Sequence, residues 1–203
     1  MGTRHLICVF SDGEYKVAQY GQWDGYPEGQ GVDVLNFLLH EFKRDVFLEK
    51  LKMVSFGTQE QLMAQWKECG ADDSGWVSFE VSNLHKEKYP ENSRDTGAEI
   101  LKIIQKTKKP LLLCNSLDFA ADSLFCEWAY VIDLDKNTFE VFKGFNTEPL
   151  NENERFYHLK YDPKHRTEKY YPVRLVESFN LNNLPTVEEF LNKFRDEEED
   201  EDG

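Results

Sequence analysis

Two short apolar runs separated by a turn open the chain. Residues 4–10 and 15–20 are rich in apolar side chains, and the dipeptide Asp12-Gly13 lies between them. Asp-Gly between two such runs is typical of a β-hairpin, because glycine accepts the positive φ that a tight turn imposes. The pattern therefore predicts an antiparallel hairpin over residues 4–20.

Apolar residues recur at helical spacing in several later segments. Capping boxes, in which a Thr is followed three residues later by Gln or Glu, begin two of these segments at Thr58 and Thr186. Basic residues and then Pro110 follow the most regular segment, as is common where a helix ends. The predicted helices span residues 32–43, 47–54, 58–69, 98–106 and 186–194.

The remaining apolar runs predict further strands. Residues 128–133 and 138–143 are expected to form a second hairpin, because apolar and polar residues alternate in its second half. The segment from residue 70 to residue 89 is compatible with a short strand or with a loop that contains a helical turn. Shorter strands are predicted at residues 111–114, 156–161 and 171–179.

Hairpins mixed with separate helices, without a regular βαβ alternation, favour an α+β fold. We expect a mainly antiparallel sheet that is built from hairpins and covered by helices. The glycine fingerprints of Rossmann and P-loop proteins are absent from the sequence. A length of 203 residues with 40% hydrophobic content suits one domain, which we place at residues 1–195.

The net charge of −14 is concentrated at the C-terminus, where the seven consecutive acidic residues 196–202 supply half of it. Adjacent like charges repel one another and do not pack, so residues 196–203 are predicted to form a disordered acidic tail. Such a tail either keeps a protein in solution or binds a partner. The acidic balance disfavours nucleic acid and anionic membranes as partners.

The cysteines and histidines give no sign of a metal site or a cofactor, and none is expected. The four cysteines show neither C-x-x-C spacing nor the density of a disulfide scaffold. No signal-peptide pattern and no apolar stretch of about 20 residues occurs, so we expect a soluble, cytoplasmic protein. The histidines lack ligand spacing and are interpreted as surface or locally hydrogen-bonded side chains: His5, His40, His85, His158 and His165.

The loop over residues 21–31 combines four glycines with side chains that are able to bind a ligand. Gln22, Trp23, Asp24 and Tyr26 place an amide, an indole, a carboxylate and a phenol on backbone that can approach a ligand closely. Such a set is suited to orient a polar planar group. The alternative is that the two aromatic residues pack on the following helix and that the Asp-Gly pair only makes a turn.

A second candidate binding element, residues 93–97, precedes the helix predicted over residues 98–106. Its Ser, Asp and Thr residues are suited either to cap that helix or to form a small anion site at its N-terminus. Arg94 does not suit capping, but it is able to hold a carboxylate or phosphate, or to pair with Glu91 or Asp95. We hypothesise that Arg94 or Asp95 lines one pocket together with the four loop side chains.

The N-terminal motifs carry a resemblance to a known family. Residues 2–7 (GTRHLI) and 20–27 (YGQWDGYP) resemble the opening of a family of small microbial and phage proteins whose activity is uncharacterised. The resemblance is confined mainly to residues 2–31. It implies no particular activity.

The opening strand and its Asp-Gly turn also bear a fainter resemblance to N-terminal nucleophile hydrolases of the choloylglycine type. That resemblance implies Thr3 as the nucleophile and Asp24 as the carboxylate of an R-x-x-D element, whose Arg is missing here. Met1 and Gly2 would have to be removed, because the N-terminal amine acts as the base. Two functions are therefore carried forward: binding of a small molecule or protein through the 21–31 loop, and amide cleavage at Thr3.

Overall fold

The computed structural model describes residues 2–72, 77–159 and 170–199, the last four of these by their backbone alone. The strands are β1 (His5–Ser11), β2 (Glu14–Gly21), β3 (Val54–Phe56), β4 (Leu111–Leu113), β5 (Trp128–Asp133), β6 (Thr138–Lys143) and β7 (Arg174–Asn180). The α-helices are α1 (Val32–Asn36), α2 (Arg44–Leu51), α3 (Gln59–Glu68), α4 (Phe79–Lys88), α5 (Glu99–Lys106) and α6 (Val187–Glu199). Shorter helical turns are η1 (Pro27–Gly31), η2 (Phe37–Glu41), η3 (Pro90–Asn92) and η4 (Leu117–Ala121).

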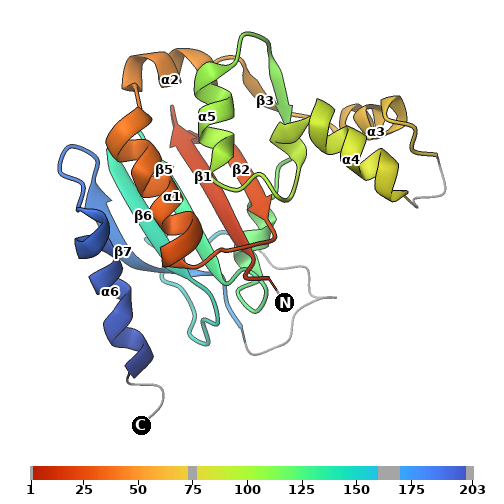
Figure 1. The fold of residues 1–203 in the computed structure, drawn as a ribbon. Helices are drawn as coiled ribbons and strands as arrows, with labels where there is room; N and C mark the ends of the chain where they lie inside the picture. Colours follow the sequence, from red (N-terminus) through yellow and green to blue (C-terminus); the bar gives the residue numbers. More distant parts are fainter. Residues whose placement is uncertain (1, 73–76, 160–169, 200–203) are drawn as a thin grey trace.

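A five-stranded sheet in the order β2-β1-β5-β6-β7 forms the centre of the structure (Figure 1). All neighbouring strands in it are antiparallel except β1 and β5, which run parallel. A small second sheet pairs β3 with β4 in parallel. The predicted α+β fold with a mainly antiparallel sheet is confirmed, and two hairpins supply four of the five strands of the larger sheet.

The turns of both predicted hairpins have the backbone that their sequences favour. Asp12 and Gly13 join β1 to β2 with φ of 56° and 78°, which is the geometry of the tight turn expected from Asp-Gly. Asn137, with φ of 59°, closes the turn from β5 to β6. Both hairpins therefore follow from local sequence alone.

The first helical segment begins five residues earlier than predicted. The π-helical turn η1, α1 and the π-helical turn η2 follow one another without a break from Pro27 to Glu41. Pro27 suits the first position, because its missing N–H would have no partner there. The second half of the loop predicted at residues 21–31 is therefore helical, and only residues 22–26 connect β2 to it.

Three other predictions need correction. The helix predicted over residues 47–54 is α2, which ends at Leu51, and Val54 instead begins β3, because β4 offers it a parallel partner. Residues 156–158, predicted as part of a strand, lie in turns, Leu159 has no regular structure, and residues 160 and 161 are outside the described residues. The strand predicted from residue 171 begins at Arg174.

The ambiguous segment before Tyr89 contains a ten-residue helix, α4. Ser78 caps it, because its Oγ accepts a hydrogen bond from the Val81 N–H at 3.3 Å. Helices α3, α5 and α6 lie where the sequence predicts them, although α6 extends to Glu199 and so includes the first residues of the acidic run. Residues 200–203 are outside the described residues, and the disorder of the tail stays a prediction.

The two faces of the sheet are covered differently. Helices α1, α2, α5 and α6 cover one face, and their apolar side chains form the larger core with Ile7, Val9 and Tyr130 (Figure 1). The other face is covered by the irregular segments between β4 and β7, which contribute Ala120 and Phe156 to a smaller core. Polar side chains of the sheet are therefore buried under helices on one face and under loops on the other.

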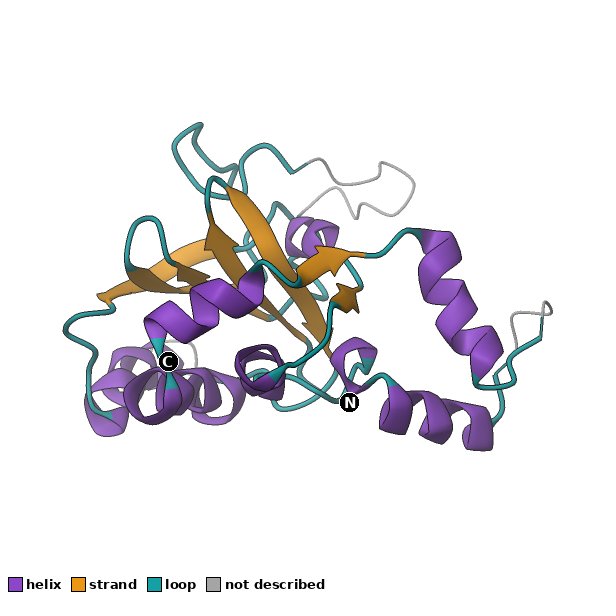
Figure 2. Ribbon diagram, turned by 90° about the horizontal axis from the view of Figure 1, so that it is seen from above, coloured by secondary structure: helices purple, strands orange, loops and turns teal. Residues whose placement is uncertain are grey.

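Helices α3 and α4, which we call the arm, project from the side of the sheet domain (Figures 1 and 2). Neither core cluster of the described residues includes a side chain from these two helices. The arm is held together instead by a stack of Trp66 on His85, with ring centroids 3.6 Å apart and an interplanar angle of 4°. It is joined to the body by Asn92, whose Nδ2 donates to Gln65 Oε1 of α3 and to the Leu112 carbonyl of β4.

Candidate functional site

The connection from β2 to η1 is fixed in place by its backbone. The Gly25 N–H donates to the Thr3 carbonyl at 3.0 Å, and the buried Tyr130 hydroxyl donates to the Gly25 carbonyl at 2.8 Å. The Gln22 N–H donates to the Arg94 carbonyl at 2.9 Å, which ties the loop to the segment before α5. The glycines thus allow close approach of other parts of the same chain.

Among the predicted site residues, Trp23 and Asp95 are brought together. Trp23 Nε1 donates to Asp95 Oδ1 at 3.0 Å, and the half-exposed indole lies against Gly2, where a Cβ would come within 2.1 Å of the ring. The indole therefore connects the N-terminus to the segment before α5. This packing differs from the alternative in which the indole rests on the following helix.

The other predicted loop residues have separate roles. Gln22 Oε1 accepts a hydrogen bond from the Tyr20 hydroxyl, 2.5 Å away. Asp24 has φ of 55°, and its carbonyl accepts from the Gln30 N–H at 2.8 Å, which is a turn role. Tyr26 is half exposed and precedes η1 without a side-chain capping bond. None of these three side chains lines the hollow described next, which Arg94 and Asp95 do line.

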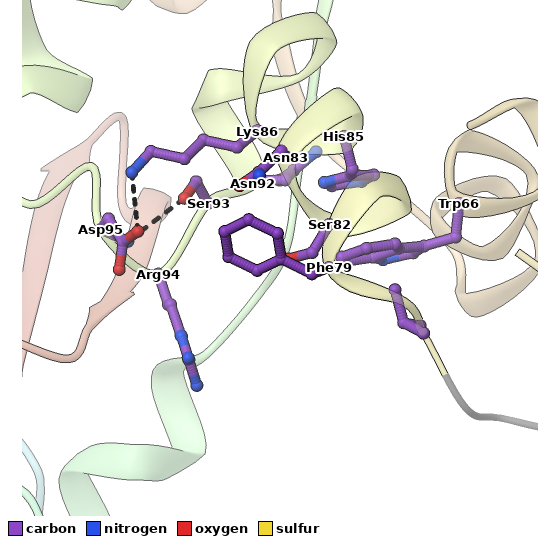
Figure 3. Close-up of a pocket in the computed structure, with 11 residues that line it drawn as sticks. Trp66, Phe79, Ser82, Asn83, His85, Lys86, Asn92, Ser93, Arg94 and Asp95 are labelled. Carbon is purple, nitrogen blue, oxygen red and sulfur yellow. Dashed lines mark hydrogen bonds and ion pairs between the residues drawn. The ribbon is translucent and has the colours of Figure 1, made fainter. Parts of the chain in front are cut away.

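That hollow, about 510 Å³ in volume, lies between the arm and residues 92–95 (Figure 3). Its wall combines aromatic rings, amides, two hydroxyls, two cations and one carboxylate. The residues that line it are Trp66, Val77, Phe79, Ser82, Asn83, His85, Lys86, Asn92, Ser93, Arg94 and Asp95. Of the residues in the one-pocket hypothesis, Arg94 and Asp95 line this hollow, and Trp23 is connected to it through its bond to Asp95.

Some polar groups of the hollow are already engaged within the protein. Asp95 accepts from Trp23 Nε1 through one oxygen and from Lys86 Nζ through the other, 2.8 Å away, and these donors lower the pKa of its carboxyl. Asn92 is held by its two Nδ2 bonds and by the Cys114 N–H, which donates to Asn92 Oδ1 at 2.8 Å. These side chains form the wall and have little capacity left for a ligand.

Other groups remain available. Arg94 is exposed, and its guanidinium makes no hydrogen bond or ion pair with any described residue. Phe79 is 77% exposed, the largest exposed fraction among the large hydrophobic side chains described. An unpaired cation and an uncovered ring on one hollow form a surface suited to a ligand with both charged and apolar parts.

His85 adds a buried polar atom to the same wall. The side chain is 2% exposed, lies between Trp66 and Tyr89, and its Nε2 has no hydrogen-bond partner among the described residues. Burial lowers the pKa of His85, so the imidazole is neutral at neutral pH. A buried ring nitrogen without a partner is an expensive feature for a fold to keep.

His5 and Gln19 are two further buried polar side chains that the sequence interpretation missed. Both nitrogens of His5 and the Oε1 of Gln19 lack partners among the described residues, although the two side chains are almost completely buried. The interpretation of the histidines as surface or locally hydrogen-bonded is therefore wrong for His5 and His85. Gly21 faces His5 across β1 and β2, a contact that the sequence pattern does not reveal.

Thr3 is 5% exposed, and its carbonyl is bonded to the loop. In a chain that retains Gly2, this hydroxyl is covered and has no amine beside it to act as a base. The side chains of Ser93 and Thr96 do not cap α5, because Ala98 is the N-cap, and its N–H donates to Gln30 Oε1 at 2.7 Å. Anion binding by this segment stays a prediction.

A smaller hollow of about 280 Å³ lies between α1, η2 and α5. Its lining includes Asp33, Glu41 and Glu99, and its one cation, Lys102, is already paired with the two glutamates at 3.1 and 3.3 Å. Within the described residues, no three His, Cys, Asp or Glu side chains are grouped as a metal site requires. The larger hollow is therefore the stronger candidate.

None of the described helices combines the length and the hydropathy that crossing a membrane requires. Comparisons of the chain with protein-family models, with curated proteins and with solved structures find no match. The function is therefore argued from the geometry of the hollow itself.

Proposed function

We propose that this protein binds a small organic molecule in the hollow between the arm and residues 92–95. The observation that carries the proposal is the buried His85 Nε2, which has no partner among the described residues and belongs to the wall of the hollow. Ligand sites of this kind combine apolar rings with a few polar groups that fix orientation. The hollow has both, in Phe79 and the Trp66–His85 stack on one side and in Arg94 on the other.

The 21–31 loop is connected to this site through Trp23. Trp23 Nε1 donates to Asp95, which also accepts from Lys86 of α4, so these two bonds connect the loop to the arm. The loop then acts as a positioning element, and the ligand lies next to it. The burial of Thr3 gives no support to amide cleavage at that residue, and binding is the function that we carry forward.

A fragment screen by ligand-observed NMR tests the proposal with a matched pair of variants. Phe79→Ala removes an exposed ring from the hollow, whereas Leu84→Ala removes an exposed side chain from the same helix outside it. We expect fragments that bind the wild type to lose their signal with Phe79→Ala and to keep it with Leu84→Ala. Circular dichroism establishes that both variants are folded.

The imidazole of His85 provides the second measurement. Its resonances, assigned by comparison with His85→Phe, are expected to shift when a bound fragment is added, and Trp23→Ala should weaken the same fragments by releasing Asp95. A folded Phe79→Ala protein that binds every fragment as the wild type does, with His85 resonances unmoved, would contradict small-molecule binding in this hollow.

A further inference from the structure

The electrostatics of the hollow restrict what it binds. We infer that the ligand is a planar aromatic or heteroaromatic molecule that carries a single anionic group, a carboxylate or a phosphate. This inference rests on the proposed function and names the ligand class of that site. Its three arguments concern the charge, the ring surface and the neutral imidazole.

The charge argument depends on which cation is unpaired. Lys86 and Arg94 both line the hollow, but Lys86 donates to Asp95 and is neutralised by it. Arg94 makes no hydrogen bond or ion pair with the described residues, so the hollow presents one uncompensated positive charge. Guanidinium binds carboxylate and phosphate groups through paired N–H donors. One unpaired cation suits one anionic group and leaves a polyphosphate largely uncompensated.

The ring argument depends on the exposed aromatic surface. Phe79 is 77% exposed at the hollow, in the same wall as the Trp66–His85 stack (Figure 3). An exposed aromatic ring gains by covering its face or edge with another ring, in offset or edge-to-face contact. A flexible aliphatic anion would satisfy Arg94 but leave this surface open to water.

The imidazole argument concerns what His85 adds. Because burial lowers its pKa, His85 contributes a hydrogen bond and no charge, so the count of one free cation holds at neutral pH. Ser82 and Asn83 line the same wall, and neither side chain makes a hydrogen bond with a described residue. In this inference, His85, Ser82 and Asn83 bind polar atoms of the ligand's ring through hydrogen bonds without charge. Arg94 alone binds the ligand's anionic group.

Fluorescence titration with naphthalene probes tests the inference. The probes are 2-naphthoate, 2-naphthyl phosphate and the neutral 2-naphthamide, which keeps the ring and shape of the carboxylate. Wild-type protein is expected to bind at least one of the two anions about tenfold or more tightly than the amide, because a charge-assisted bond to Arg94 contributes at least that factor. Whichever anion binds more tightly identifies the anionic group.

Variants locate the effect. Arg94→Gln should remove the preference for the anion while leaving affinity for 2-naphthamide unchanged, and Arg195→Gln, an exposed arginine on α6, should change neither. Sodium acetate, which has the charge without the ring, should not compete at concentrations that saturate the naphthyl probe. Equal affinity of wild type for the anions and the amide, or a preference that survives Arg94→Gln, would overturn the inference.

The failure of the ligand class is distinguishable from the failure of the proposed function. If fragments bind in a manner that depends on Phe79 but none prefers an anion, the hollow binds ligands of another class and only the inference is wrong. If no fragment binding depends on Phe79, the proposed function itself is wrong.

Discussion

The two faces of the sheet bury polar side chains in contrasting ways. On the face covered by loops, the charged side chain of Arg155 is almost completely buried and is paired with the buried carboxylates of Asp133 and Glu140. On the face covered by helices, the neutral groups His5 and Gln19 are equally buried, yet three of their polar atoms have no partner among the described residues. The comparison shows that buried charges need partners more strictly than buried neutral polar atoms do.

The charged cluster is saturated with bonds. Arg155 Nε donates to Glu140 Oε2 at 2.6 Å, its Nη2 donates to Glu140 Oε1 at 3.1 Å and also to Asp133, and its guanidinium lies 5.2 Å from the centre of the Phe10 ring. Asp133 Oδ1 also accepts from the Asp135 and Lys136 N–H groups at 3.0 and 2.7 Å. These bonds offset the cost of removing three charges from water.

The neutral pair is enclosed without being bonded. The His5 ring lies against Gly21, where a Cβ would come within 2.1 Å of it, and the His5 Cβ lies near Gly25, where a Cβ would be 2.9 Å away. Gln19 Nε2 donates to the Ser93 carbonyl at 3.0 Å, but its Oε1 accepts nothing. An unpaired neutral atom costs about 1–3 kcal/mol, which a fold survives, whereas an unpaired buried charge costs more.

The largest expected effect comes from breaking the charged cluster. Arg155→Met leaves Asp133 and Glu140 buried without their counter-charge, so we expect the free energy of unfolding to fall by about 3–5 kcal/mol in urea titrations. Lys88→Met, which removes one partner of an exposed ion pair on the arm, is the control and should leave the midpoint unchanged. Similar midpoints for the two variants would contradict the contrast between buried and exposed ions.

The pH dependence of His5 gives the next effect. Burial lowers its pKa to about 4, against the opposing influence of the nearby Thr3 carbonyl, while the unfolded chain has the ordinary value of 6.5. The unfolded state therefore binds the proton first, and stability is lost as the pH falls from 6.5 to 4, by about 3 kcal/mol from this residue.

His5→Gln isolates that contribution, because glutamine does not titrate. Denaturant titrations of the wild type and the variant at pH 7 and pH 4 should show a smaller acid loss for the variant, by about 3 kcal/mol. Equal acid losses in the two proteins would mean that His5 is protonated in the folded state.

A smaller effect tests the enclosure of His5. In Gly21→Ala, the new methyl group would come within 2.1 Å of the buried His5 imidazole, so we expect a loss of about 1–3 kcal/mol. The double variant His5→Ala with Gly21→Ala should lose less than the sum of the two single variants, since the clash is absent from it. Strict additivity would show that Gly21 matters for reasons unrelated to His5.

The smallest effect is expected at Gln19. Gln19→Met removes the unpaired oxygen, and the Ser93 carbonyl keeps its second donor, the Thr96 N–H at 3.2 Å. We therefore expect a change within about 1 kcal/mol in either direction. Glu140→Met on the opposite face is the matched comparison, and it should cost several times more because it leaves Arg155 with one carboxylate. Equal costs would remove the distinction between the two faces.

Local sequence determined the elements whose causes lie within a few residues. The Asp12-Gly13 hairpin turn, the Thr58 and Thr186 capping boxes and the amphipathic α5 were all predictable, because turn geometry, capping bonds and one apolar face are properties of neighbouring residues. Binding through residues near Trp23 was a hypothesis that the sequence supported by composition alone.

Tertiary structure decided the partners that lie far apart in the chain. Val54 became a strand residue because β4 lies beside it, and His85 became part of a candidate site because residues 92–95 meet α4 across the hollow. Likewise His5, which is enclosed by Gly21 and Gly25, was buried by contacts that no local pattern reveals. Burial, pairing and cavities arise from long-range packing, and they shift a side chain's hydrogen bonding and pKa in ways that its neighbours in sequence do not encode.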